Sequence, residues 1–451
     1  MEENSRTVIL FEISEPFQNT GVFREKVLSL LYRFKQLNSH IIPVPSEVIG
    51  ITKRRLEQEG HEVRFLTKLD DVGNFSDLFS PQETPNWCTN KTVFYIDKSD
   101  KFAAEVAAHI WQAKKALFYG DIEEPCLTES SFAVIVISAR NINFTALETL
   151  IIKLHESNIC YGLLPILNNL SDWTRTICLF HSDKAGPLRK SNLLIDRLSK
   201  PHFSEPEKNY KGCLVDVTLF SGHSSAIDMR ISDDFILCSR KDKDPEKKSK
   251  YPCWASGSCA KQQLVGRQPC SIEGLYEIQE LSGRVNVLNG CSLSSLGSTF
   301  IDYESTLIGQ LVKNDVNIIA PTLMVSGSFK RNLLFLALLH DGYSLGEVVS
   351  IVNSSIYEQC PKADKKWQLG STFLLFGNPL FRFESRTLEE RKISLPRPHI
   401  PNFHRRKTTR NVKVQKANKI QTEIPSDYQA INNISCGFKI GEWQSLYVFR
   451  K

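Results

Sequence analysis

The chain has 451 residues, of which 41% are hydrophobic and 24% are charged, proportions that are typical of folded globular proteins. They exclude a mostly disordered chain, a collagen and a short disulfide scaffold. The longest apolar runs, residues 132–137 and 333–339, are too short to cross a bilayer. The first six residues are polar and include two acidic ones. We therefore expect no secretory signal, a cytoplasmic location and mostly reduced cysteines.

The net charge of +6 is unevenly distributed along the chain. Residues 383–451 contain 14 Lys and Arg against 6 Asp and Glu, a net charge of +8, which leaves −2 for the residues before them. The basic tail could bind an acidic protein, a precursor peptide or nucleic acid, although a charge run is more often a solvated face. Because the body is not basic, we do not expect a general nucleic-acid-binding protein.

The N-terminal region, residues 1–129, alternates short apolar runs with helix-like stretches. The spacing of its apolar residues predicts helices over residues 23–38 and 101–118. A stretch rich in Ser, Pro, Asn and Asp, residues 74–92, predicts a loop between them. With the apolar residues at its start, the segment 93–118 would form one strand–helix unit of an α/β region.

From residue 130 onwards, strands and helices are predicted to alternate. The continuous apolar run 132–138 is typical of a strand covered on both faces, and an amphipathic helix follows over 144–156. Further strands are predicted at residues 159–167, 176–180, 213–220, 285–288 and 317–323, further helices at 329–340 and 345–353, and an antiparallel excursion at 229–239. This alternation predicts an α/β fold with a mainly parallel sheet.

Two segments fall outside this alternation. Residues 240–250 contain six basic and three acidic residues and predict a solvated loop that is open to proteases, including self-cleavage after its lysines. Residues 384–451 form a basic C-terminal extension. Its last part, residues 431–449, regains apolar content and predicts a strand or hairpin.

Two predicted strands end in residues that are suited to nucleophilic catalysis. One is followed by Gly222 and His223, and the other by Gly290 and Cys291. If these strands are neighbours, the histidine and the cysteine meet at the carboxyl edge of the sheet. An imidazolium favours ionisation of a nearby thiol, and it can later protonate a leaving amine. The predicted chemistry is acyl transfer, most simply peptide hydrolysis.

Five motifs in chain order resemble those of the CHAT-type peptidases, which belong with separases to the caspase-fold group of cysteine peptidases. The motifs are Ser221-Gly222-His223-Ser224, Asn289-Gly290-Cys291-Ser292, the strand at residues 316–322, the helix start GYSLGEV at 342–348 and the closing strand FLLFGNPLFRF at 373–383. The resemblance covers residues 130–383. It implies a caspase-like three-layer sandwich with a mainly parallel sheet over these residues.

The resemblance also implies roles for individual residues. It makes His223 the general acid and base and Cys291 the nucleophile, with main-chain groups around Gly222, Ser224 and Gly290 forming the oxyanion hole. Two residues depart from the family pattern, because Ser224 stands where the family usually has Gly and Asn378 where it has Asp. The long segment 240–280 would narrow substrate choice, and residues 1–129 would be a regulatory domain or a decayed copy of the peptidase.

Acidic residues near these strands are candidates for a pocket that accepts an Arg or Lys side chain. They are Asp216, Asp302 and Glu304, and the alternative for each is an ordinary turn or a core carboxylate.

The spacing of four cysteines does not indicate a zinc site. Cys238, Cys253, Cys259 and Cys270 are separated by 15, 6 and 11 positions, unlike the paired spacing of zinc sites. We therefore expect no metal and no cofactor, and the sequence contains no Gly-rich phosphate loop.

We expect a cytoplasmic cysteine endopeptidase that cuts a specific protein or precursor peptide and is activated or inhibited by a protein partner. The first alternative is a catalytically silent caspase-fold subunit that binds or regulates another protein. The second is an adaptor that acts through the basic tail. A membrane partner is not expected.

Overall fold

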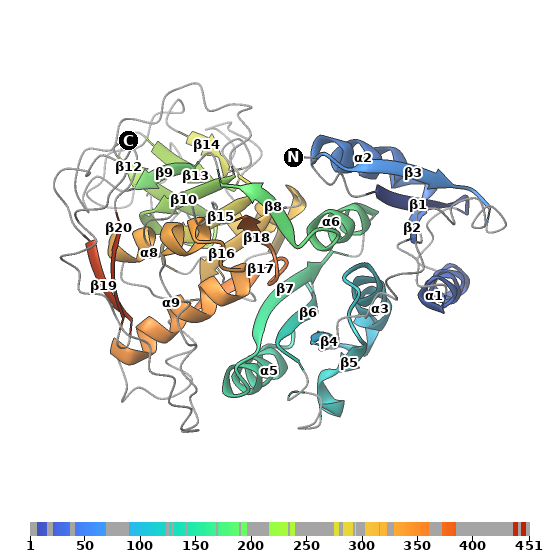
Figure 1. The fold of residues 1–451 in the computed structure, drawn as a ribbon, viewed down its shortest axis with the longest axis horizontal. Helices are drawn as coiled ribbons and strands as arrows, with labels where there is room; N and C mark the ends of the chain where they lie inside the picture. Colours follow the sequence, from blue (N-terminus) through green and yellow to red (C-terminus); the bar gives the residue numbers. More distant parts are fainter. Residues whose placement is uncertain are drawn as a thin grey trace. The chain divides into compact units, whose positions relative to one another are not determined.

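The computed structural model describes residues 7–15, 21–36, 41–68, 90–122, 127, 130–139, 142–167, 170–188, 191–195, 216–232, 235–239, 275–278, 283–291, 294, 303–314, 316–322, 329–359, 372–384, 436–440 and 443–447. The chain divides into two compact units (Figure 1), one of Met1–Ile151, Tyr161–Ser182 and Lys313–Asp315, the other of Ile152–Cys160, Asp183–Val312 and Val316–Lys451. The domain limits at residues 130 and 384 stay predictions.

The first unit begins with a βαβαβ segment. Its elements are β1 (Thr7–Ile13), α1 (Gly21–Gln36), β2 (Ile41–Pro45), α2 (Ser46–Gln58) and β3 (Glu62–Leu66). The three strands are parallel and lie in the order β2-β1-β3. Helix α1 confirms the helix predicted at 23–38. It buries one apolar face of Phe23, Val27, Leu30, Leu31 and Phe34, which recur every three or four residues.

A second set of strands in this unit lies in the order β5-β4-β6-β7. The elements are β4 (Lys91–Tyr95), η2 (Lys98–Asp100), α3 (Lys101–Ile110), β5 (Ala116–Phe118), η3 (Tyr119–Asp121), β6 (Phe132–Ser138), α5 (Phe144–Glu156), β7 (Cys160–Ile166) and α6 (Leu170–Phe180). Strand β4 is parallel to both β5 and β6. The predicted elements at 132–138, 144–156 and 159–167 are confirmed.

The helix predicted at 101–118 is wrong beyond Ile110. Gln112 has φ of 55°, a left-handed conformation that cannot continue a helix. The buried ammonium of Lys91 donates a hydrogen bond to the Trp111 carbonyl at 3.1 Å, and residues 116–118 then form β5 beside β4. The predicted loop 74–92 is also wrong at its end, because Lys91 begins β4; its residues 74–89 lie outside the described residues.

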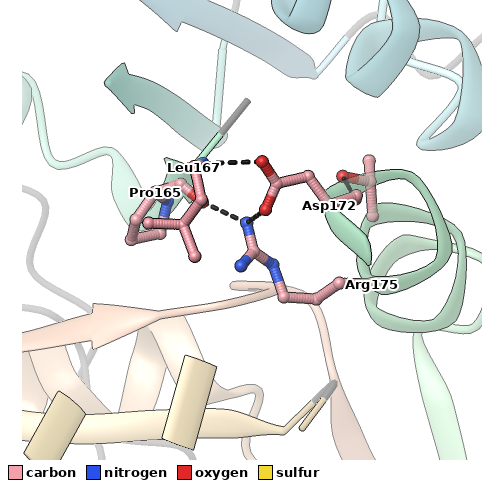
Figure 2. A network of polar contacts seen from close by, with 5 residues as sticks. Pro165, Leu167, Asp172 and Arg175 are labelled. Carbon is pink, nitrogen blue, oxygen red and sulfur yellow. Dashed lines mark hydrogen bonds and ion pairs between the residues drawn. The ribbon is translucent and has the colours of Figure 1, made fainter. Parts of the chain in front are cut away.

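The strand predicted at 176–180 is wrong, because these residues complete helix α6. The helix starts beside the end of β7, where the Asp172 carboxylate accepts the Leu167 amide at 2.6 Å (Figure 2). Arg175 lies 3.2 Å from the same carboxylate and donates to the Pro165 carbonyl. Both charged side chains are buried. An acidic residue in the first turn favours a helix, and this signal outweighs the β-branched run that follows it.

The second unit contains most of the remaining elements. They are β8 (Lys184–Pro187), β9 (Ser191–Ile195), β10 (Val217–Ser221), β11 (His223–Ser224), β12 (Asp228–Ser232), β13 (Phe235–Cys238), β14 (Leu275–Glu277), β15 (Val285–Asn289), η7 (Tyr303–Ser305), α7 (Leu307–Leu311), η8 (Val312–Asn314), β16 (Asn317–Pro321), α8 (Phe329–His340), α9 (Leu345–Gln359), β17 (Phe373–Phe376), β18 (Arg382–Glu384), β19 (Cys436–Ile440) and β20 (Trp443–Tyr447).

The main strands of the second unit lie in the order β17-β16-β15-β10-β9. Neighbouring strands are parallel, except that β17 runs antiparallel to β16. One face of the strands packs against α8 and α9 (Figure 1) in a core that includes Leu219, Val287, Ile319, Phe335 and Val348. The α/β class with a mainly parallel sheet is therefore confirmed.

A small sheet of order β11-β12-β13-β14 adjoins this unit. Strand β12 is antiparallel to β11 and β13, so the antiparallel excursion predicted at 229–239 is confirmed. The C-terminal hairpin is confirmed as well, because β19 and β20 pair antiparallel. Residues 240–250 lie outside the described residues. None of the described helices is long and apolar enough to span a membrane.

Candidate active site

The two strands that precede His223 and Cys291 are direct neighbours in the sheet. Strands β10 and β15 pair in parallel, and their last registered pair is Ser221 with Asn289. His223 and Cys291 each follow two residues after this pair. They therefore leave the sheet at the same edge and at the same level, as expected for two residues at the carboxyl ends of parallel strands.

Exposure distinguishes Cys291 from the other cysteines that the structure describes. Cys160, Cys178 and Cys238 are buried, whereas Cys291 is half-buried and His223 is exposed. Burial raises the pKa of the Cys160 and Cys178 thiols to about 12. These two thiols stay protonated at neutral pH and are poor nucleophiles. Among the four cysteines whose burial the structure describes, Cys291 is thus the one that a substrate can reach.

Ser224 links the histidine segment to the cysteine. Its hydroxyl donates a hydrogen bond of 2.7 Å to the main-chain carbonyl of Cys291. A glycine at this position would have no side chain to form this bond. The bond holds the corner after β10 against the corner after β15. The sequence analysis placed the main chain of Ser224 in the oxyanion hole and noted its departure from glycine, but no signal in the sequence indicated the partner of its hydroxyl.

Position 290 has room only for glycine, because the segment Gly222–Ser224, which contains His223, lies directly against it. A Cβ atom at this position would overlap the Ser224 hydroxyl, and it would lie 2.8 Å from the Gly222 carbonyl oxygen and 2.9 Å from the Ser224 Cβ. Contacts below 3.0 Å are not found for real Cβ atoms. The prediction that this glycine allows a close approach of two main chains agrees with these distances.

The main chain of Gly222 has a different role from the predicted one. Its amide donates to the Asn289 carbonyl at 3.3 Å and so extends the ladder between β10 and β15. An amide that is bonded in the ladder cannot also stabilise an oxyanion. We therefore remove the Gly222 amide from the candidate oxyanion hole and retain the amide of Cys291.

The structure describes the side chain of only one of the three acidic candidates, Asp216. Asp216 precedes β10, so the strand, five residues or roughly 16 Å long, separates it from the edge with His223; its carbonyl accepts the Val285 amide at 3.0 Å. Glu304 belongs to η7, where the Ser305 carbonyl accepts a hydrogen bond from the Ser239 hydroxyl, and its side chain lies outside the described part of the structure. Asp302 lies outside the described residues.

Two buried amide side chains near the cysteine were missed by sequence reasoning. Asn289 Nδ2 lies 2.5 Å from Asn332 Oδ1, and both residues are fully buried. The bond connects the end of β15, two residues before Cys291, to the first turn of α8. A buried Asn at the end of an apolar strand gives no indication of its partner, because Asn289 and Asn332 are 43 positions apart.

No group of three or more His, Cys, Asp or Glu side chains with the geometry of a metal site occurs among the described residues. Of the four cysteines considered for zinc, Cys238 is buried, and Cys253, Cys259 and Cys270 lie outside the part of the chain that the structure describes.

Asn378, where the sequence analysis noted an Asn in place of Asp, donates two hydrogen bonds. Its side-chain Nδ2 donates to Asp183 at 2.9 Å, and its main-chain amide donates to the Asn317 side chain at 2.9 Å. It is a buried structural residue.

Comparison of the chain with models of known families, with curated proteins and with solved structures found no match. The fold and the site define an α/β protein with a cysteine and a histidine at the carboxyl edge of its sheet.

Proposed function

We propose that the chain is a cysteine endopeptidase of the caspase-fold type, with Cys291 as nucleophile and His223 as general acid and base. The observation that carries the proposal is the parallel pairing of β10 with β15, which ends both strands in register just before these residues. The half-buried Cys291 and the exposed His223 are accessible to a peptide. The order of the five motifs supports the caspase-like arrangement.

The proposed reaction has two steps. The Cys291 thiolate attacks the scissile carbonyl, a C–S bond forms, and the C–N bond breaks as the His223 imidazolium protonates the leaving amine. Water then attacks the thioester carbon while His223 takes up one of its protons, and the C–S bond breaks to release the acid and to restore the Cys291 thiolate beside the His223 imidazolium. The Cys291 amide would stabilise the oxyanion in both steps.

Substrate and partner are further parts of the proposal. We expect a specific protein or precursor peptide as the substrate, and a protein that activates or inhibits the enzyme, because an unrestrained protease would damage the cell. Glu304 and Asp302 stay candidates for the pocket, because Asp302 and the side chain of Glu304 lie outside the described part of the structure. Asp216 is not retained.

A catalytically silent binding or regulatory subunit is the second candidate. The observation that favours it is the engagement of the Gly222 amide in the sheet, which leaves fewer donors for an oxyanion. Both candidates are compatible with the same fold, so the reactivity of the thiol has to decide between them.

Alkylation of Cys291 tests the proposal. Iodoacetamide labelling of the full chain between pH 5 and 8, followed by peptide mapping, should give faster labelling of Cys291 at pH 6 in the wild type than in His223→Ala. The same rate in both proteins, with labelling only at alkaline pH, would contradict an activated thiol. Ser225→Ala is a control, because its hydroxyl contacts Asp228 and not the cysteine.

A further inference from the structure

Two buried asparagines beside the candidate active site keep polar side-chain atoms without a partner. Asn289 and Asn332 are fully buried, and the side-chain nitrogen of Asn289 donates to the side-chain oxygen of Asn332. Asn289 Oδ1 and Asn332 Nδ2 have no hydrogen-bond partner within the part of the chain that the structure describes. Each such atom has lost its bonds to water on folding, which lowers stability. Nearly all buried polar groups in proteins are bonded, so this pair requires a physical reason.

Two other buried asparagines of the second unit are fully bonded. Asn286, near the start of β15, accepts the Gly283 amide at 2.9 Å and donates to the Gly283 carbonyl at 2.8 Å. Asn353 on α9 accepts the Phe373 amide at 2.8 Å and donates to the Phe373 carbonyl at 3.0 Å. Both side chains are fully buried. The same fold therefore pairs a buried amide completely where the amide serves only to join two segments.

Asn289 connects helix α8 with both corners of the candidate active site. It is the last residue of β15 and stands two positions before Cys291. Its main-chain carbonyl accepts the amide of Gly222, the residue before His223, at 3.3 Å. Its side chain donates to Asn332 in the first turn of α8. A shift of Asn289 relative to α8 would therefore move the cysteine and the histidine segments together.

A polar pair fixes this strand end in a way that an apolar pair would not. Apolar contacts are not directional, so they permit a strand end to slide over a helix. A hydrogen bond restricts both the distance and the angle between its partners. The influence of an imidazolium on a thiol depends on their separation. The bond between Asn289 and Asn332 thus favours a defined position over maximal stability, as is typical of functional sites.

We propose that Asn289 and Asn332 are positioning residues of the candidate active site. Through their bond, α8 holds the end of β15, and the end of β15 holds the Gly222 amide. Cys291 and His223 then keep the separation at which the imidazolium favours the thiolate. This inference rests on the proposed function, because it concerns the activation of the Cys291 thiol.

Replacement of both amides by leucine separates position from stability. Leucine has the same branched arrangement of side-chain heavy atoms as asparagine, and the double replacement removes both unpaired polar atoms. Asn289→Leu/Asn332→Leu should therefore unfold at the same urea concentration as the wild type or at a higher one. Iodoacetamide labelling of Cys291 at pH 6 should nevertheless slow at least about tenfold. The midpoint of labelling against pH should rise towards that of an ordinary cysteine.

Asn286→Leu is the matched control, because it changes a fully buried asparagine of the same strand. It loses both bonds to Gly283 and should unfold at a lower urea concentration. Its labelling of Cys291 should follow the wild-type pH profile, since the bond at the other end of β15 is intact. The control thus loses stability and keeps an activated thiol, the reverse of the double variant.

Each contrary outcome identifies the idea that fails. An unchanged labelling profile in Asn289→Leu/Asn332→Leu would overturn the inference, as would a loss of stability as large as that of Asn286→Leu or a failure to fold. Equal slowing of labelling in the double variant and in the control would overturn it too, because a general loosening of the strand would explain both. A wild type that labels Cys291 no faster than His223→Ala would contradict the proposed function and with it this inference.

Discussion

Gly290→Ala should distort the candidate active site through a defined pair of contacts. The new methyl group would lie 2.8 Å from the Gly222 carbonyl oxygen and 2.9 Å from the Ser224 Cβ, and it would overlap the Ser224 hydroxyl. The hydroxyl can rotate away, but it then loses its 2.7 Å bond to the Cys291 carbonyl. The main-chain contact cannot be relieved without separating the corners after β10 and β15.

The expected loss of stability in Gly290→Ala has two contributions, the lost hydrogen bond and the overpacking against the main chain. Loss of the hydroxyl bond costs about 0.5–1.5 kcal/mol, and overpacking against main chain costs about 1–3 kcal/mol. We expect Gly290→Ala to lower the free energy of unfolding by about 2–4 kcal/mol, with loss of the enhanced Cys291 alkylation. Ser224→Gly removes one of the two obstacles and should recover about half of the loss in the double variant.

Urea denaturation of the two single variants and the double variant measures this coupling. The matched control is Gly50→Ala on α2, where a Cβ atom meets nothing within 4 Å, and we expect no loss of stability there. A change of less than about 0.5 kcal/mol for Gly290→Ala, or strictly additive effects with Ser224→Gly, would refute the close approach of the two segments.

Three further predictions concern other parts of the chain. Burial raises the pKa of Asp100 from 3.8 to about 6, so stability falls as the pH rises from about 4 to 6; Asp100→Asn should match the wild type at pH 4 and exceed it by up to about 3 kcal/mol at pH 8. Urea titrations at both pH values check this, and an unchanged difference would contradict it. Arg175→Ala leaves the buried Asp172 carboxylate without its ion pair (Figure 2) and should cost about 3–5 kcal/mol, partly recovered by Asp172→Asn; equal stability of the single and double variants would argue against the pair. Deletion of residues 386–451 should preserve cleavage of a small peptide, whereas an adaptor would lose its partner in a pull-down assay.

The strands and helices of the second unit could be predicted because their apolar patterns are strong. The helices at 329–340 and 345–353 begin where the patterns indicated, and the same holds for the continuous run at 132–138 in the first unit. The failures have local causes. Residues 176–180 resemble a strand by composition, but Asp172 starts a helix five residues before Ile177. The end of helix α3 at Gln112 is not marked by a glycine in the sequence. The turn there is held by a hydrogen bond from Lys91, which lies 20 positions away.

The site was predictable in part. The strand ends with Gly222-His223 and Gly290-Cys291 indicated which residues share one edge of the sheet, because the carboxyl ends of parallel neighbours lie at the same edge. The bonds of Ser224 and Asn332 were not predictable, since their partners are 67 and 43 positions away. The place of Asp216 at the far end of its strand depends on where β10 begins, and strand limits are the least certain part of a pattern.

The most direct test of the proposed activity compares the purified wild-type chain with Cys291→Ala and His223→Ala. Each protein is incubated with fluorogenic peptides that vary at the residue before the scissile bond, and intact mass is recorded. We expect turnover or self-cleavage in the wild type and at least about a hundredfold less in either variant. Cleavage of equal rate in Cys291→Ala would contradict the assignment of the nucleophile. Silence of the wild type, with slow alkylation of Cys291, would contradict the peptidase and support the silent binding subunit.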